Sequence, residues 1–108
     1  MKQFTTPSQT TILKELGFEE PKSISNIDTI NKGVIIINKN YSLGELINML
    51  PIKLEDVGIN TTLAIHFDNN LANVEYIGLL GVEYSILNKE LVDALYEMII
   101  KLKKEKLI

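Results

Sequence analysis

The chain has 108 residues, 45% of them hydrophobic, so it can bury a core and fold as one domain, 1–108. It contains no cysteine, which excludes disulfides and thiolate metal sites. The net charge is −3 and all eleven cationic residues are lysines. Because arginine makes bidentate contacts to phosphate and guanine that lysine cannot copy, this composition argues against a protein that reads duplex DNA.

The chain begins with a helix signal at Thr6–Gln9. Thr6 can cap the helix, Pro7 suits its first position, and Gln9 completes a capping box. We expect Gly17 to end this helix, with Phe18 folding back on it. No apolar run precedes the helix and none in the chain reaches membrane-spanning length, so we expect neither a signal peptide nor contact with a membrane.

A first hairpin is predicted around the tight-turn sequence Asn31-Lys32-Gly33, which separates three spaced isoleucines from Val34–Ile37. The run Val34–Ile37 is continuously apolar, as is typical of a strand covered on both faces. Either helices cover both faces, or a second copy of the chain covers one. Asn38–Asn40 is predicted to be a turn.

A short second helix is predicted within Tyr41–Pro51. Ser42 is its expected cap, Glu45 completes a second capping box, and Pro51 ends it. Irregular chain is then expected over Ile52–Asn60, with Gly58 as a turn residue.

A second hairpin is predicted from Thr62–Phe67, where polar and apolar residues alternate, and a return strand at Val74–Leu80. Gly78 is expected to mark a bulge. The sequence leaves open whether Val82–Leu87 extends the sheet or turns away. The predicted fold class is therefore α+β: a small antiparallel sheet of two hairpins with three helices, in the order α-β-β-α-β-β-α.

The last helix is expected to start at a cap on Asn88 and to run almost to Ile108. Its apolar arc spans roughly 240°, whereas a helix that faces one core needs about 100°. We therefore predict that Tyr96 and Ile100 form an oligomer interface; the alternative is that they pack under a loop. The lysines near its end either complement the helix dipole or attract a phosphate-bearing molecule or acidic partner.

Candidate chemistry is sparse. His66 is the only histidine, and beside Asp68 it could act as a general base, but no motif marks a nucleophile to accompany it. We therefore expect no enzyme, no cofactor and no metal site. Because aromatic rings stack on nucleobases, the candidate ligand-binding residues are Tyr41, Ser42, His66, Tyr76 and Tyr84. For each tyrosine the alternative is a half-buried place at the edge of the core.

Two stretches resemble a known family. Tyr41–Pro51 resembles the aromatic-Ser-Leu-x-x-Leu-x-x-x-Leu-Pro segment of small phage and prophage proteins of gut Bacteroidales, and Asp93–Ile99 resembles their C-terminal helix. Leu13–Gly17 fits as well. The chain differs from that family at Tyr41 and Asn40, where tryptophan and proline are common. The family has no established activity, so the resemblance implies only a setting: a phage accessory protein in the bacterial cytoplasm.

These observations predict a non-catalytic, homo-oligomeric binding protein that sequesters a small host ligand, such as a nucleotide immune signal, in an anti-defence role. The alternative is a protein-interaction module that inhibits a host protein or serves phage assembly or replication. Ligand capture requires a pocket on which tyrosine and lysine converge. Protein interaction requires an exposed apolar patch instead.

Overall fold

The computed structural model describes residues 1–30, 33–56 and 59–108, and its principal extents are 60 × 32 × 17 Å. The described residues form three helices and six strands, in the order α1 (Pro7–Glu15), β1 (Ile24–Ile30), β2 (Val34–Lys39), α2 (Leu43–Met49), β3 (Lys53–Asp56), β4 (Ile59–Asp68), β5 (Leu71–Gly78), β6 (Gly81–Asn88) and α3 (Leu91–Lys104). The α+β class is confirmed. The strands form two separate antiparallel sheets, β1-β2 and β3-β4-β5-β6, and not the single sheet that we expected.

The local helix signals are confirmed. Both capping boxes are formed: the Thr6 hydroxyl accepts from the amide of Gln9, and the Ser42 hydroxyl accepts from the amide of Glu45. The first helix is terminated as expected by Gly17, which follows the C-cap residue Leu16 and has a φ of +98°; the amide of Phe18 donates back to the carbonyl of Leu13 over 3.2 Å.

The four-stranded sheet contains two strands that the sequence did not settle. The prediction of irregular chain over Ile52–Asn60 was wrong, because β3 pairs with β4 and its Leu54 is buried. Gly58 lies outside the described residues. Val82–Leu87 falls within β6, so it extends the sheet. The bulge lies between Tyr76 and Ile77 and not at Gly78.

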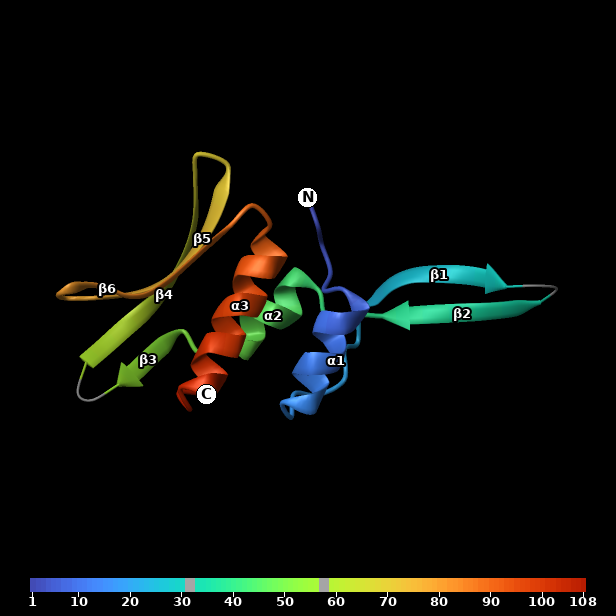
Figure 1. Ribbon diagram of the computed structural model, residues 1–108, viewed down its shortest axis with the longest axis horizontal. Helices are drawn as coiled ribbons and strands as arrows, with labels where there is room; N and C mark the ends of the chain where they lie inside the picture. Colours follow the sequence, from blue (N-terminus) through green and yellow to red (C-terminus); the bar gives the residue numbers. More distant parts are fainter. Residues whose placement is uncertain (31–32, 57–58) are drawn as a thin grey trace.

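Helix α3 is the centre of the core. It packs against β5 and β6 on one side and against α2 on another. Helix α1 lies on the far side of α2 from the four-stranded sheet (Figure 1). At about 100° per residue, its buried residues span roughly 160° of its circumference: Leu91, Val92, Ala94, Leu95, Met98, Ile99 and Leu102. About two thirds of the wide apolar arc, roughly 160° of 240°, is thus covered within one chain, and an interface at its uncovered flank stays a prediction. Tyr96 and Ile100 are half-buried at the edge of this core.

The ends of α3 differ from the prediction. Its N-cap residue is Glu90 and not Asn88, whose side chain instead accepts from the Glu90 amide over 3.0 Å. The helix stops at Lys104 and does not approach Ile108. Lys106 adopts a left-handed φ of +58°, which turns the chain so that the Leu107 amide donates to Leu102.

Strands β1 and β2 form a hairpin, here called the arm, that projects beyond α1 (Figure 1). Asn38 and Lys39, which we expected in a turn, belong to β2. No described helix packs extensively on the arm. Val34, Ile35, Ile36 and Ile37 are all exposed, so the first of the two alternatives, that helices cover both faces of this strand, was wrong.

Candidate functional site

The arm has one face made almost entirely of aliphatic side chains. The strand register places Ile27 opposite Ile37, Thr29 opposite Ile35, and Ile24 opposite Lys39. Paired residues point to the same side of a sheet, so these six side chains share one face. We call Ile24, Ile27, Ile35 and Ile37 the aliphatic face of the arm, and each of them is at least half exposed.

The other face of the arm is more polar. Asp28 lies at its middle and accepts hydrogen bonds from the side-chain amides of Asn26 and Asn38, over 3.0 and 2.9 Å. Ile36 lies opposite Asp28 on this face, and Val34 lies nearer the turn. One face of the arm is therefore aliphatic and the other is mixed, and no described element outside the arm packs extensively on either face.

A buried polar network fixes the base of the arm. The Thr10 hydroxyl of α1 donates to Oδ1 of Asn40, whose amide donates to the Ser25 hydroxyl over 2.8 Å. Ser25 in turn donates to the carbonyl of Asn38 over 3.1 Å. Nearby, the Thr5 hydroxyl accepts from the Tyr41 amide over 3.0 Å. These bonds hold the arm in a set direction, away from the body of the molecule.

A second apolar projection lies at the β5–β6 turn. Leu79 and Leu80 form its tip and are fully exposed, and Gly81 next to them adopts a φ of +116°. Turns of this kind usually carry glycine, asparagine or aspartate, so two leucines are not explained by turn geometry. This tip and the arm occupy opposite ends of the long axis (Figure 1).

His66 belongs to a polar cluster on the face of the sheet that points away from α3. Its Nε2 lies 2.9 Å from Oε1 of Glu75, which also accepts from the amide of Asn73. The His66 side chain is 49% exposed and that of Glu75 only 9%. Ser85 completes the cluster, but it donates to Asn73 over 3.1 Å and not to His66.

This geometry orients an exposed imidazole against a buried carboxylate. A histidine held in this way can exchange protons with a bound molecule. The imidazole does not activate the Ser85 hydroxyl as a nucleophile, however, because that hydroxyl is engaged with Asn73. The cluster therefore satisfies its own polar groups and is not arranged as a catalytic triad.

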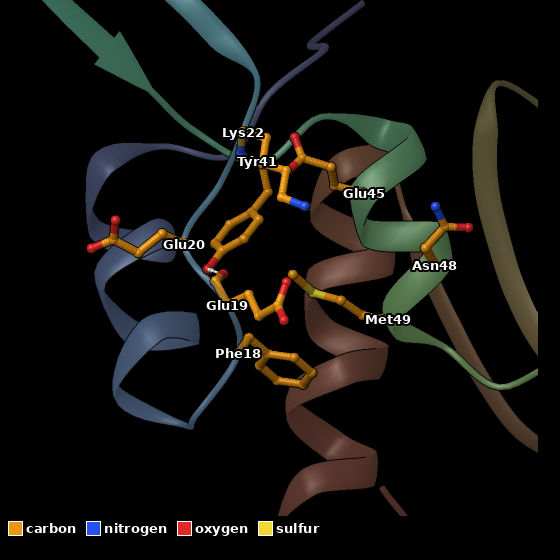
Figure 2. A pocket seen from close by; sticks show the side chains of 8 residues that line it. All are labelled: Phe18, Glu19, Glu20, Lys22, Tyr41, Glu45, Asn48 and Met49. Carbon is orange, nitrogen blue, oxygen red and sulfur yellow. Dashed lines mark hydrogen bonds between the residues drawn. The ribbon is translucent and has the colours of Figure 1, made fainter.

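Tyr41 lies in the wall of a hollow of about 510 Å³ between α1 and α2 (Figure 2). Its hydroxyl donates to the backbone carbonyl of Glu19. Phe18 and Met49 line the lower part of the hollow, and Glu20 and Asn48 point to either side. Ser42 caps α2 next to it, and its hydroxyl is engaged with the amide of Glu45.

The charge of this hollow is unfavourable for a phosphate. Its charged lining residues are Glu19, Glu20, Glu45 and Lys22. Burial acts to raise the pKa of Glu45, but hydrogen bonds from the Ser23 side chain and from the Lys22 and Ser42 amides outweigh it and hold that pKa below its usual value. Burial, followed by the charges of Glu45 and Glu20, raises the pKa of Tyr41. A neutral tyrosine among carboxylates suits a cation better than an anion.

Tyrosine and lysine come together on the exposed flank of α3. The ammonium group of Lys101 lies 5.8 Å from the centre of the Tyr84 ring. Beside it is an open hollow of about 300 Å³, lined by Tyr96, Glu97, Ile100, Lys101 and Lys104. This is the place where the structure comes nearest to the pocket that ligand capture requires.

The five candidate ligand-binding residues do not converge on one site. Tyr41 and Ser42 lie beside α1, His66 lies on the outer face of the sheet, and Tyr84 lies under Lys101. Tyr76 is fully buried in the core, and its hydroxyl donates to the carbonyl of Pro51 over 2.7 Å. It is thus placed as a core residue.

The candidate site residues predicted from the sequence include no residue of the arm or of the Leu79–Leu80 tip. The aliphatic face of the arm was signalled by the continuous apolar run Val34–Ile37, for which covering helices and a second copy were both left open. The Leu79–Leu80 tip was signalled by two leucines between glycines, where turn residues are usually small or polar.

Comparisons with known proteins give no relative: no family model, no curated protein and no solved structure matches the chain. Within residues 1–30, 33–56 and 59–108, no three histidine, aspartate or glutamate side chains are grouped so as to hold a metal ion. Among the described helices, none combines the length and apolar character needed to cross a membrane.

Proposed function

We propose that the protein is a non-catalytic protein-interaction module, and that it contacts other protein chains through the arm and the Leu79–Leu80 tip. The setting implied by the sequence resemblance, a phage accessory protein in the bacterial cytoplasm that inhibits a host protein or serves phage assembly or replication, is part of this proposal. The carrying observation is that exposed aliphatic side chains gather on two hairpins at opposite ends of the molecule.

The energetics favour covering these surfaces. Burying an isoleucine side chain contributes about 1.5–3 kcal/mol, so covering four that are half exposed contributes about 3–6 kcal/mol. Soluble monomers rarely expose large contiguous apolar patches, and such patches usually mark sites that bind another molecule. The fold itself does not need them, because the core is built from other residues, among them Leu13, Leu46 and Leu95.

Affinity capture from an extract of the bacterial host tests the proposal. The tagged protein is compared with Leu79→Asp/Leu80→Asp and Ile35→Asp variants, and with Leu87→Asp as a matched control on an exposed position of β6. We expect a defined host or phage protein that is retained by the chain and by the control and lost from at least one of the other variants. If every retained protein binds all four chains equally, the proposal is wrong.

A second candidate is capture of a small phosphate-bearing aromatic ligand, such as a nucleotide immune signal. The observation in its favour is the joint presence of Tyr84, Tyr96, Lys101 and Lys104 on the flank of α3. In this alternative Tyr96 and Ile100 also face a second copy, which would close the hollow. A thermal-shift screen against cyclic and linear dinucleotides and ADP-ribose derivatives tests it. Stabilisation that Lys101→Ala removes would support capture, and no shift with any compound would rule it out.

A further inference from the structure

We infer that the aliphatic face of the arm is a self-association surface, on which a second copy of this chain packs its own arm face to face. The inference rests on the proposed function, because it assigns one of the two apolar surfaces to a particular partner. It places the dimer contact on Ile24, Ile27, Ile35 and Ile37, at the far end of the molecule from the Leu79–Leu80 tip.

The arm is a two-stranded sheet with an apolar face that no described element covers extensively. A two-stranded hairpin is marginal in water unless its apolar face packs on something. Here the base is fixed by the Asn40 network, and no described element outside the arm packs extensively on it. Two twisted sheets with β-branched faces pack well on each other at about 10 Å.

The composition of the face favours a second copy over a foreign protein. Interfaces with foreign partners are anchored by tryptophan, tyrosine and arginine, whereas contacts between identical subunits resemble a core cut in two. The chain has no tryptophan and no arginine, and the described positions of the face hold only isoleucine, Thr29 and Lys39. A uniform aliphatic surface is complementary to itself, as a twofold axis requires.

The charges are compatible with a twofold arrangement. Lys39 is the one charged residue among the described positions of this face, and it lies at the base of the arm, opposite Ile24. When two arms pack antiparallel about a twofold axis, each Lys39 lies near the far end of the other arm, so the two ammonium groups are kept apart. Ile27 and Ile37, the middle pair of the described positions of this face, then lie close to the axis, with Thr29 and Ile35 next to them.

The size of the contact sets its strength. Strand β2 has six residues and is roughly 20 Å long, so two crossed arms bury less surface than the 1,200–2,000 Å² of a standard interface. The dimer is therefore reversible and forms with rising concentration. It carries a Leu79–Leu80 tip at each outer end, which makes the assembly bivalent toward the partner of the proposed function.

Analytical ultracentrifugation of the full chain tests the dimer. We expect the average mass to rise from monomer toward dimer between about 1 and 200 μM, and Ile35→Glu to weaken association at least about tenfold. Leu79→Glu at the opposite tip and Ile100→Glu on α3 are the matched controls, and both should leave association unchanged. All three positions are at least partly exposed, and circular dichroism shows whether each variant is folded.

Cysteine cross-linking tests which face is buried. The chain has no cysteine, so a single introduced thiol reports on one position only. Thr29→Cys lies on the aliphatic face and Asn26→Cys on the polar face of the same arm, and both positions are exposed. A short bis-maleimide should link Thr29→Cys chains into covalent dimers and link Asn26→Cys chains much less.

The outcomes separate the inference from the proposed function. A monomer throughout the concentration range, a dimer that Ile100→Glu or Leu79→Glu disrupts while Ile35→Glu does not, or cross-linking through Asn26→Cys alone would each overturn the inference. A monomer that still retains its host partner would leave the proposed function standing. A dimer through the arm that retains no partner would confirm the inference and contradict the proposed function.

Discussion

Asn40 and Ser25 are joined by a hydrogen bond of 2.8 Å, from the side-chain amide of one to the hydroxyl of the other, at the point where the arm leaves the body. Asn40 is buried, and it also accepts from the Thr10 hydroxyl of α1. Its side chain therefore connects a helix of the body to β1, and Ser25 extends the connection to the Asn38 carbonyl of β2. The direction of the arm depends on this small network more than on apolar packing.

Removal of this connection should destabilise the protein. In Asn40→Ala the buried Thr10 hydroxyl loses an acceptor and Ser25 loses a donor, so we expect the free energy of unfolding to fall by about 1–3 kcal/mol. Urea denaturation measures this. Asn26→Ala, which removes an exposed amide on the arm itself, should cost less than about 0.5 kcal/mol. Equal losses for the two variants would contradict the assigned role of Asn40.

Because α3 lies at the centre of the core, shortening one of its buried side chains should strongly destabilise the protein. Ile99 is fully buried within the core, so Ile99→Ala should lower the free energy of unfolding by about 2–5 kcal/mol. Ile47→Ala, at a partly exposed position of α2, is the control and should cost clearly less. Chemical denaturation with an unchanged m-value would measure both. A loss below about 1 kcal/mol for Ile99→Ala would show that α3 is not packed on both sides.

Tyr76 predicts a loss of stability in alkali. Burial raises the pKa of Tyr76 to about 12 in the folded protein, from 10.0. Between these values the unfolded chain releases the proton first, so the folded state binds more protons and stability falls as pH rises, by about 1.4 kcal/mol per unit.

Comparison with Tyr76→Phe isolates this residue from the lysines, which titrate in the same range. At pH 8 the natural chain should be more stable than the variant by about 1 kcal/mol, because its hydroxyl donates to Pro51. That advantage should disappear by about pH 11. An advantage that stays constant from pH 8 to pH 11 would mean that the hydroxyl is not buried.

Asp93 predicts a loss of stability in acid. Burial acts to raise its pKa, but hydrogen bonds from Lys2 and Gln9 and the charge of Lys2 outweigh it and lower that pKa. The Lys2 ammonium lies 2.7 Å from its carboxylate and the Gln9 amide 2.8 Å, which ties the N-terminal segment to α3. The carboxylate therefore contributes stability above its usual pKa, and this contribution is lost as pH falls through the lowered folded value.

Asp93→Asn should accordingly cost about 0.5–1 kcal/mol at pH 7 and almost nothing near pH 2. Asp68→Asn, at an exposed position beside the β4–β5 turn, serves as the control and should change little at either pH. Thermal unfolding at a series of pH values gives both numbers. If Asp93→Asn lowers the stability equally at pH 7 and pH 2, the ionised carboxylate of Asp93 does not stabilise the fold through Lys2.

The parts of the fold that could be predicted are those encoded within a few residues. The capping boxes of Thr6 and Ser42 and the glycine ending at Gly17 all depend on neighbours three to five positions away. Strand β3 could not be found in this way, because it is a short edge strand held by its pairing with β4. Its four residues show no clear alternation, so only the partner strand defines it.

The surroundings of the candidate site residues could not be predicted, because burial depends on distant parts of the chain. Tyr41 and Tyr76 were selected because aromatic rings bind ligands; Tyr76 lies within the core, whereas Tyr41 is buried but borders the hollow between α1 and α2. The body packs on α3 from two sides but leaves Tyr96 and Ile100, where a second chain was predicted, partly exposed. Exposed apolar residues remain on the Leu79–Leu80 tip and on the arm, where a covering copy was one of the two alternatives for the run Val34–Ile37.

Amide hydrogen exchange, measured at two protein concentrations, tests most directly whether the arm is an association surface. We predict that the amides of residues 24–30 and 34–39 become more protected as concentration rises from about 5 to 500 μM, while those of β4 and β5 stay unchanged. In Ile35→Glu the arm should exchange rapidly at both concentrations. If the arm of the natural chain exchanges at the same rate at both concentrations, its aliphatic face is not covered by a second copy.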